Sequence, residues 1–231
     1  MSFFFQTSGF EFPTNLPQCG VGTETVADCF TSDLWTDNNS YLAVNTGSGR
    51  IDFDVGLAAD QNAATIRLTT NVSDTAWVLR FTIRFTFLDA TSGSPGNLIC
   101  GMSDSDQSVQ GDQAQDWIGT RMLPTLDFFR TNATNGAAPR AGDLTDDAYN
   151  FIIDTDYFCE ISRQSATTFN ASLSSTASYT KDLINKTGVT CSSSTIDTDY
   201  IKFMDSGDSV NDQATGYIKT LQFWNGVTSP P

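Results

Sequence analysis

The segment 77–88 constrains the fold of this chain more than any other stretch. Apolar side chains stand at every second position from Trp77 to Phe87, and most of the positions between them hold Arg or Thr. Successive side chains of a β-strand point to opposite faces of a sheet, so the pattern predicts a strand with one buried and one polar face. Such unlike faces are typical of an antiparallel sheet, and Arg80 and Arg84 are expected to project together from the polar face.

Shorter runs of the same kind recur between clusters of Asp, Asn, Gly and Ser. Short strands separated by turn residues predict an all-β antiparallel sandwich or barrel, and no stretch keeps the 3.6-residue period of a helix. A single helical turn is expected at 181–185. The expected strands, about eleven or more, are 41–44, 50–55, 64–68, 77–88, 97–102, 125–129, 149–153, 157–163, 168–173, 200–204 and 216–224.

The size and composition of the chain fit one large core. Its 231 residues are 39% hydrophobic and include seventeen Phe, and all-β folds regularly reach this length as one domain. We expect one sandwich domain at 28–231 and an N-terminal segment at 1–27 that packs on the sandwich or extends from it. No run approaches the roughly eighteen apolar residues of a membrane helix, so no membrane insertion is expected. The start, MSFFFQTSGF, has no basic region and is not predicted to be a secretory signal.

The charge balance and the absence of His exclude several classes of function. Twelve Lys and Arg stand against twenty-seven Asp and Glu, which gives a net charge of -15. Nucleic acids are bound through basic surfaces, and the sequence has no basic stripe, so no nucleic-acid partner is expected. Without His, the chain has no Ser/His/Asp or Cys/His nucleophile system and no His ligand for a metal.

The five Cys are too scattered for a disulfide scaffold, and no Cys-x-x-Cys pair indicates a metal site. Cys100 and Cys159 lie in predicted strands, where buried free thiols are expected. Cys19 and Cys29 are close enough in sequence to pair in an oxidising compartment, and the sequence leaves their state open.

The order of four segments resembles a known family. They are DCFTSDLWTDNNSYLAVNTGSGRIDF at 28–53, DTAWVLRFTIRF at 74–85, IDTDYFCEISR at 153–163 and ATGYIKTLQFWNGV at 214–227. Together they resemble a concanavalin A-like lectin/glucanase domain of the laminin-G-like jelly-roll type, over most of the chain. The resemblance implies two stacked, curved antiparallel sheets, with the N- and C-terminal strands adjacent. The resemblance is a pattern of strands rather than a catalytic signature, so it predicts the fold more specifically than the function.

Catalysis on a glycan would need a suitable pair of carboxylates. Enzymes of this fold that cleave β-glucans carry a Glu-x-Asp-x-x-Glu strand, and this sequence has none. The nearest approach is Asp52 and Asp54, which a strand would place on one face roughly 6.5 to 7 Å apart. We interpret these two residues as part of a solvated outer face. The chain is therefore predicted not to be an enzyme, with a polysaccharide-active glycosidase or lyase as an alternative.

Calcium is the metal that this sequence favours. The resemblance implies it, because many members of the superfamily hold Ca²⁺ in loops, and clustered Asp oxygens suit a hard cation. Two Asp-rich stretches qualify, with acidic surface loops as the alternative interpretation, and neither fits an EF-hand. The candidate ligands are Asp104, Asp106 and Asp112, near Asp116, or alternatively Asp205, Asp208 and Asp212.

Sugar binding would need an exposed aromatic ring beside polar side chains. Trp117, next to Asp116 in a region that we read as a loop, is the first candidate, and Arg121 lies nearby. Trp35, close to Asn38, is the second. For Trp117, we favour a place in the core over contact with a ligand.

These features favour a non-enzymatic surface module that binds a glycan or cell-surface receptor on an extracellular or virion surface. The alternative is a structural coat, decoration or fibre subunit of a virus particle, which would contact neighbouring coat subunits or form a homo-oligomer through its sheet edges.

Overall fold

The computed structural model describes residues 35–37, 41–55, 63–68, 71–89, 97–106, 114–138, 145–205 and 213–230. These residues form fourteen strands and no helix. The strands are β1 (Thr36–Asp37), β2 (Leu42–Asn45), β3 (Arg50–Val55), β4 (Ala63–Arg67), β5 (Trp77–Asp89), β6 (Leu98–Ser103), β7 (Gln115–Leu123), β8 (Phe128–Ala137), β9 (Thr145–Ala148), β10 (Asp156–Arg163), β11 (Thr168–Ser174), β12 (Ile184–Thr190), β13 (Tyr200–Asp205) and β14 (Gln213–Asn225).

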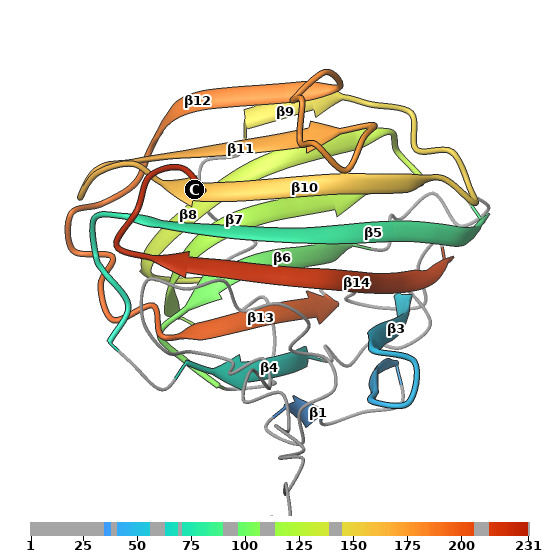
Figure 1. Ribbon diagram of the computed structural model, residues 1–231, viewed down its shortest axis with the longest axis horizontal. Coiled ribbons are helices and arrows are strands. Elements are labelled where there is room, and N and C mark those ends of the chain that lie inside the picture. The colour runs from blue at the N-terminus through green and yellow to red at the C-terminus, as the bar shows by residue number, and fades with distance from the viewer. Residues whose placement is uncertain are drawn as a thin grey trace, which may run out of the picture.

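The strands build two seven-stranded antiparallel sheets that lie one behind the other in Figure 1. Sheet A has the order β1-β4-β13-β6-β7-β8-β9, and sheet B has the order β12-β11-β10-β5-β14-β3-β2. β14 lies between β5 and β3, whereas the first described strand, β1, lies in sheet A, so among the described strands the first and last are not adjacent, contrary to the expectation. The fold is the predicted all-β sandwich. No helix that could cross a membrane occurs in the described part of the chain.

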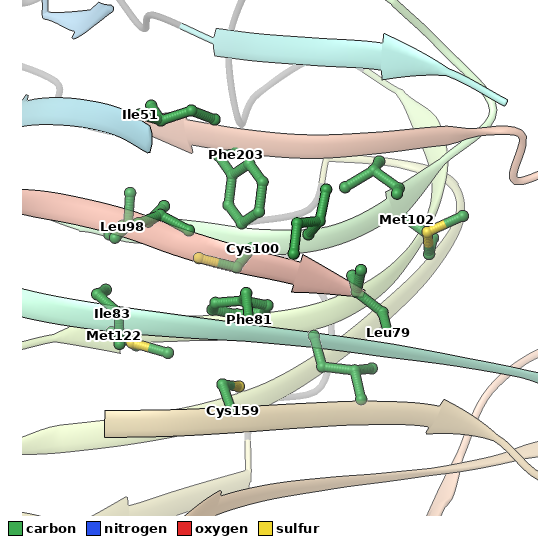
Figure 2. Close-up of a cluster of buried hydrophobic side chains, with 14 of the residues drawn as sticks. Ile51, Leu79, Phe81, Ile83, Leu98, Cys100, Met102, Met122, Cys159 and Phe203 are labelled. Atoms are coloured by element: carbon green, nitrogen blue, oxygen red, sulfur yellow. The ribbon is translucent and has the colours of Figure 1, made fainter. Parts of the chain in front are cut away.

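The alternation along β5 is confirmed. Phe81, Ile83 and Phe85 are fully buried in the core between the sheets. The rings of Phe81 and Phe203, which belong to opposite sheets, meet edge to face at 5.3 Å between centroids, and Figure 2 shows them side by side. Burying a Phe side chain stabilises the fold by about 1.5 to 3 kcal/mol, so this row is a main source of stability. Phe87 departs from the pattern, because at the end of β5 it is 46% exposed.

Several predicted elements differ from the structure. The segment 125–129 is mostly the turn between β7 and β8, and the predicted helical turn at 181–185 is wrong, because Leu183 and Lys181 lie in a loop and β12 begins at Ile184. The segment 149–153 is not a strand.

The residues at 149–153 instead cross from one sheet to the other at one end of the sandwich. The Tyr149 N–H donates to the Asp127 carbonyl beside sheet A, and the Asp154 N–H donates to the Phe85 carbonyl of sheet B. The ring of Phe151 packs edge to face on Phe85 at 5.2 Å. The apolar run is therefore explained by closure of the core and not by strand pairing.

The predicted thiols are confirmed. Cys100 and Cys159 are free thiols, buried on opposite sheets. Cys191 is also free and buried, at the edge of the core. Burial raises the pKa of the Cys100 and Cys159 thiols, which makes them poor nucleophiles. Cys19, Cys29 and the segment 1–27 lie outside the described residues.

Candidate ligand-binding site

The second face of sheet A points away from the core and carries polar side chains around a small buried apolar cluster of Ala63, Ile99, Trp117 and Met204. Ile201 and Phe203 of β13 belong to the core, so their neighbours Tyr200 and Lys202 project from the opposite side. In β4, β6, β7 and β8 the side chains also alternate, so those next to core residues point to the same outer side as Tyr200 and Lys202. We call the following set the A face: Arg67, Ser103, Gln115, Trp117, Arg121, Arg130, Asn132, Tyr200 and Lys202.

A row of paired residues crosses the middle of the A face. Lys202 is paired with Gly101, Gly101 with Gly119, and Gly119 with Asn132. A Cβ atom at Gly119 would lie 2.6 Å from Cζ2 of Trp117, and one at Gly101 would lie 3.0 Å from the same atom. The indole of Trp117 therefore occupies the space over the two glycines, between Lys202 and Asn132.

Lys202 is fully buried at one end of this row. Its ammonium group donates to Oε1 of Gln115 at 3.0 Å and to the carbonyl of Ser105 at 3.2 Å. Desolvation disfavours the charged form and lowers the pKa of Lys202 to about 8, although the carboxylates of Asp104 and Asp106 act in the opposite direction. The chain thus holds a costly cation in a dry site.

Two other residues of the row carry buried polar atoms. Within the part of the chain that the structure describes, Nδ2 and Oδ1 of Asn132 and Nε1 of Trp117 are buried and have no hydrogen-bond partner. A buried polar atom left without a partner costs on the order of 1 to 3 kcal/mol, and native proteins contain few of them. These three atoms are suited to bind the hydroxyl or acidic groups of a ligand.

One margin of the A face is accessible, whereas Arg121 at the other margin is buried. Arg67 is exposed, and its guanidinium lies over the ring of the half-buried Tyr200 at 5.6 Å from the centroid. At the other margin Nε of Arg121 donates to Oδ1 of Asn97 at 3.0 Å, and Arg121 is paired with Arg130 across the strands.

The structure brings only part of the predicted sugar site together. Trp117 and Arg121 both project from the A face of β7, so the region that we read as a loop is a central strand. Trp117 is fully buried, in a small cluster with Ile99 and Met204, which agrees with its interpretation as a packed residue and not with an exposed ring for a sugar. The reason is that the two glycines allow the indole to pack down onto the sheet.

Asp116 has a structural role at the start of β7. Its carboxylate accepts hydrogen bonds from the backbone N–H groups of Gly136 and Ile196, both at 2.9 Å, and from Nδ2 of Asn135. These bonds tie β8 and the segment before β13 to β7. The oxygen atoms of Asp116 are therefore already engaged, which speaks against its predicted role as a sugar ligand.

Trp35 is a core residue. It is buried, and its ring stacks on Phe203 at 6.1 Å between centroids. The prediction that Trp35 offers a surface for a sugar is therefore wrong, and the physical reason is that β1 places it beneath sheet A rather than in a loop. Asn38, which we had grouped with it, lies outside the described residues.

The described carboxylates do not form a calcium site. Asp104 and Asp116 are linked, since the Asp116 N–H donates to Oδ1 of Asp104 at 3.0 Å, but the described residues contain no group of three His, Cys, Asp or Glu that could hold a metal. Partial desolvation also raises the pKa of Asp104. Asp106 joins no such group, and Asp205 is buried within β13. The remaining predicted ligands, Asp112, Asp208 and Asp212, lie outside the described residues.

The outer face of sheet B differs because its charges are paired with one another. The Glu160 carboxylate forms ion pairs with the guanidinium of Arg80 at 2.6 Å and with the ammonium group of Lys181 at 2.9 Å. The Asp156 carboxylate forms ion pairs with Nε of Arg84 at 2.6 Å and with the ammonium group of Lys219 at 2.9 Å. Desolvation alone would raise the pKa of Asp156, but the hydrogen bonds from Lys219 and Arg84 hold it below its ordinary value.

Asp52 and Asp54 lie on this same face, as predicted. Asp52 pairs with Arg50 at 2.7 Å, and Oδ1 of Asp54 accepts Nε2 of Gln213 at 2.7 Å. Each carboxylate thus has its own neighbour on the sheet surface. This arrangement agrees with the interpretation as an outer face.

Sequence reasoning missed Lys202 and Asn132. A signal for Lys202 did exist, because a lone Lys in the middle of the apolar run YIKFMD is unusual for a buried strand. Asn132 lies in the polar stretch RTNATN, where no local feature distinguishes it from its neighbours. Only the pairing of β7 with β8 places it opposite Gly119.

Comparisons with known proteins agree with this architecture. No family model matches the chain, and no curated protein matches it significantly in sequence. Among solved structures, the VIP36 exoplasmic/lumenal domain in its Ca²⁺/Man3GlcNAc-bound form has a TM-score of 0.55 at 12% identity and covers 89% of each chain. The Emp47p carbohydrate recognition domain has a TM-score of 0.54 at 10% identity, covering 85% of this chain and 90% of that one.

A third similar structure is the carbohydrate binding module CBM66 from Bacillus subtilis, with a TM-score of 0.50 at 11% identity, covering 83% of this chain and 96% of the module. At such identities the likeness establishes the fold alone. The chain has the concanavalin A-like jelly-roll fold, as its strand pattern implied.

Proposed function

We propose that this protein is a non-catalytic glycan-binding module and that the A face is its binding surface. The observation that carries the proposal is the set of buried, unpartnered polar atoms of Asn132 and Trp117 beside the buried Lys202. Ligand sites combine apolar surface with a few convergent polar groups, and this row has both. The similar solved structures are carbohydrate-binding domains, which supports the same class of ligand.

The outer face of sheet B is a weaker candidate. A ligand there would have to displace ion pairs such as Arg80–Glu160 and Arg84–Asp156. In both pairs the nitrogen and oxygen atoms are only 2.6 Å apart. On the A face the atoms of Asn132 and Trp117 give up no protein partner when they bind a ligand. The exposed Arg67 and the half-buried Tyr200 form the accessible margin of this face, beside the buried row.

The proposed module does not act on its ligand chemically. The row of Lys202, Gly101, Gly119 and Asn132 contains no Asp or Glu, whereas glycoside hydrolysis generally uses two carboxyl groups. The sequence also has no His to serve as a base of ordinary pKa near neutrality. Binding of a glycan is consistent with a role at an extracellular or virion surface.

Calcium does not enter the proposed binding mode. The Asp104 and Asp116 carboxylates already accept hydrogen bonds from protein groups, and the described residues supply no third ligand. Each binding experiment is therefore run with Ca²⁺ and with a chelator. Equal binding under both conditions is the expected result.

The test is a glycan array followed by titration calorimetry on the best ligands. Asn132→Leu is expected to weaken binding at least tenfold. The matched control is Ser172→Ala, which removes an unpartnered buried hydroxyl from the outer face of sheet B and is expected to leave binding unchanged. Silence of the wild-type protein across the array would reject the proposal. Release of reducing ends or unsaturated sugars from a polysaccharide panel would show that the protein is an enzyme.

A second candidate function, a structural subunit, is favoured by one apolar patch. Phe87, Ile152 and Ile153 are 46%, 60% and 48% exposed. They lie together at one end of the sandwich, since the Asp154 N–H donates to the Phe85 carbonyl at 2.7 Å. Exposed apolar clusters of this kind occur at contacts between proteins. Light scattering tests this candidate, which predicts an oligomer that Ile152→Asp dissociates, and a monomeric wild-type protein would contradict it.

A further inference from the structure

We infer that the ligand of the A face is an acidic glycan, whose carboxylate or sulfate groups bind at Lys202 and the neighbouring N–H donors. The inference rests on the proposed function and narrows it to one class of sugar.

The first argument is the distribution of positive charge. The chain has a net charge of -15 and only twelve basic residues, yet four of these project from the A face. They are Arg67, Arg121, Arg130 and Lys202. The outer face of sheet B carries as many basic side chains, but those pair with Asp and Glu, whereas Lys202 of the A face makes no ion pair with a described residue. Repulsion from carboxylates more than about 10 Å away is screened at 0.1 M salt, so of the acidic residues mainly near ones, such as Asp104 and Asp106, oppose an anion at Lys202.

The second argument is the environment of Lys202. Its ammonium group has three donors, and its contacts are the neutral oxygens of Gln115 and Ser105. No ion pair of Lys202 is present among the residues that the structure describes, and the carboxylates of Asp104 and Asp106, which raise its pKa, do not offset its desolvation. A buried cation is costly unless an anion accompanies it. Bound ligand carboxylate or sulfate would supply that anion and would raise the pKa of Lys202 back toward its ordinary value.

The third argument is that donors outnumber acceptors along the row. Nε1 of Trp117 and Nδ2 of Asn132 are both N–H donors without a partner, and Oδ1 of Asn132 is the matching acceptor. Acidic groups are acceptors only, so they suit a surface of this kind better than hydroxyl groups, which also bring hydrogen atoms to be accepted. Charge-assisted hydrogen bonds to such groups are also about twice as strong as neutral ones.

The dimensions of the row allow more than one sugar unit to bind. Lys202 on β13 and Asn132 on β8 are separated by β6 and β7. Three inter-strand spacings amount to about 14 Å, which is enough for a short oligosaccharide. An acidic unit at Lys202 and the next units over Trp117 and Asn132 would follow the row across the sheet.

The test compares matched oligosaccharides by titration calorimetry at 0.15 M salt. A neutral chitin oligosaccharide, a hyaluronan oligosaccharide with carboxylates only, and a chondroitin sulfate oligosaccharide with both acidic groups are the probes. The acidic probes are expected to bind at least tenfold more tightly than the neutral one. The hyaluronan and chondroitin sulfate arms distinguish carboxylate from sulfate as the recognised group.

The variants locate the effect on the A face. Lys202→Met is expected to weaken binding of the acidic probes at least tenfold. The matched control is Lys219→Met, which removes an ammonium group that pairs with Asp156 on sheet B and is expected to leave binding unchanged. Far-ultraviolet circular dichroism establishes that both variants are folded.

The outcomes separate this inference from the proposed function. If neutral glycans from the array or panel bind as well as the acidic probes, or if Lys202→Met binds acidic probes like the wild type, the ligand is not selected by charge and the inference fails. The module would still be a glycan-binding protein. If no glycan of either kind binds, both the proposed function and the inference fail.

Discussion

The two outer faces of this sandwich treat their polar groups in opposite ways. On sheet B, Glu160 and Asp156 each hold two basic side chains, so nearly every charge has a direct partner. On sheet A, Lys202 is buried against neutral oxygens, and Asn132 has two buried atoms without partners. The charged groups of sheet B therefore support the fold, whereas Lys202 and Asn132 of the A face cost stability. Proteins commonly keep such destabilising groups where they bind ligands.

The largest effect is expected for Glu160→Gln. The change leaves Arg80 and Lys181 beside a nearly buried site without their carboxylate. Removing one partner of a buried pair typically costs about 3 to 5 kcal/mol, and partial exposure of the two basic residues favours the lower end. Urea unfolding measures the free energy. A loss below about 1 kcal/mol would mean that sheet B does not depend on its ion pairs.

The opposite sign is expected for Lys202→Met. The folded-state pKa of about 8 lies below the ordinary value of 10.5, so burial of the charged amine opposes folding at neutral pH. Removing it stabilises the protein by up to about 3 kcal/mol at pH 7, at about 1.4 kcal/mol for each pKa unit. The measurement is again urea unfolding. A destabilised variant would contradict the view that Lys202 is held at a cost.

The pH dependence provides the internal control for Lys202→Met. Between pH 8 and 10.5 the unfolded chain holds a proton on Lys202 that the folded chain has released. The contribution of Lys202 to stability therefore rises with pH in this window, and the advantage of the variant should shrink by about 1.4 kcal/mol per pH unit. An advantage that is constant from pH 7 to 10.5 would show that Lys202 does not titrate as inferred.

A smaller gain is expected for Asn132→Leu. Replacing unpartnered polar atoms by apolar ones of similar shape is neutral or stabilising, here by about 0 to 1 kcal/mol. Thermal and urea unfolding compare the variant with the wild type. A loss above about 2 kcal/mol would show that the Asn132 amide supports the fold, and the contrast between the faces would not extend to this residue.

The smallest effect is expected for Asp52→Asn. The Arg50–Asp52 pair is short but lies at the surface, with both side chains 37% exposed. Exposed pairs of this kind contribute about 0 to 1 kcal/mol and are weakened by salt. Urea unfolding in low and high salt measures the free energy that the pair contributes and how far salt weakens it. Comparison with Glu160→Gln shows whether burial sets the strength of a pair on sheet B. An effect as large as that of Glu160→Gln would mean that burial is not the deciding factor.

The local pattern of the chain was enough to predict most of the strands and the layers. The alternation over 77–88 predicted β5 with both its buried and its polar face, and Arg80 and Arg84 do project together. The prediction failed at 149–153, where an apolar run crosses between sheets instead of pairing. Periodicity reports which residues are apolar and how they are spaced, but a short run has the same pattern whether it pairs or only closes the core.

The candidate site depended on contacts that no local pattern reports. Lys202 and Gln115, which share a hydrogen bond, are far apart in the sequence, and Trp117 is buried because Gly101 and Gly119 come from two adjacent strands. The amino-acid sequence by itself determined the all-β class, the main strands, the acidic charge and the lack of His chemistry. Only the tertiary structure decided which side chains share the A face, because strand order and register are set by the packing of segments distant in the chain.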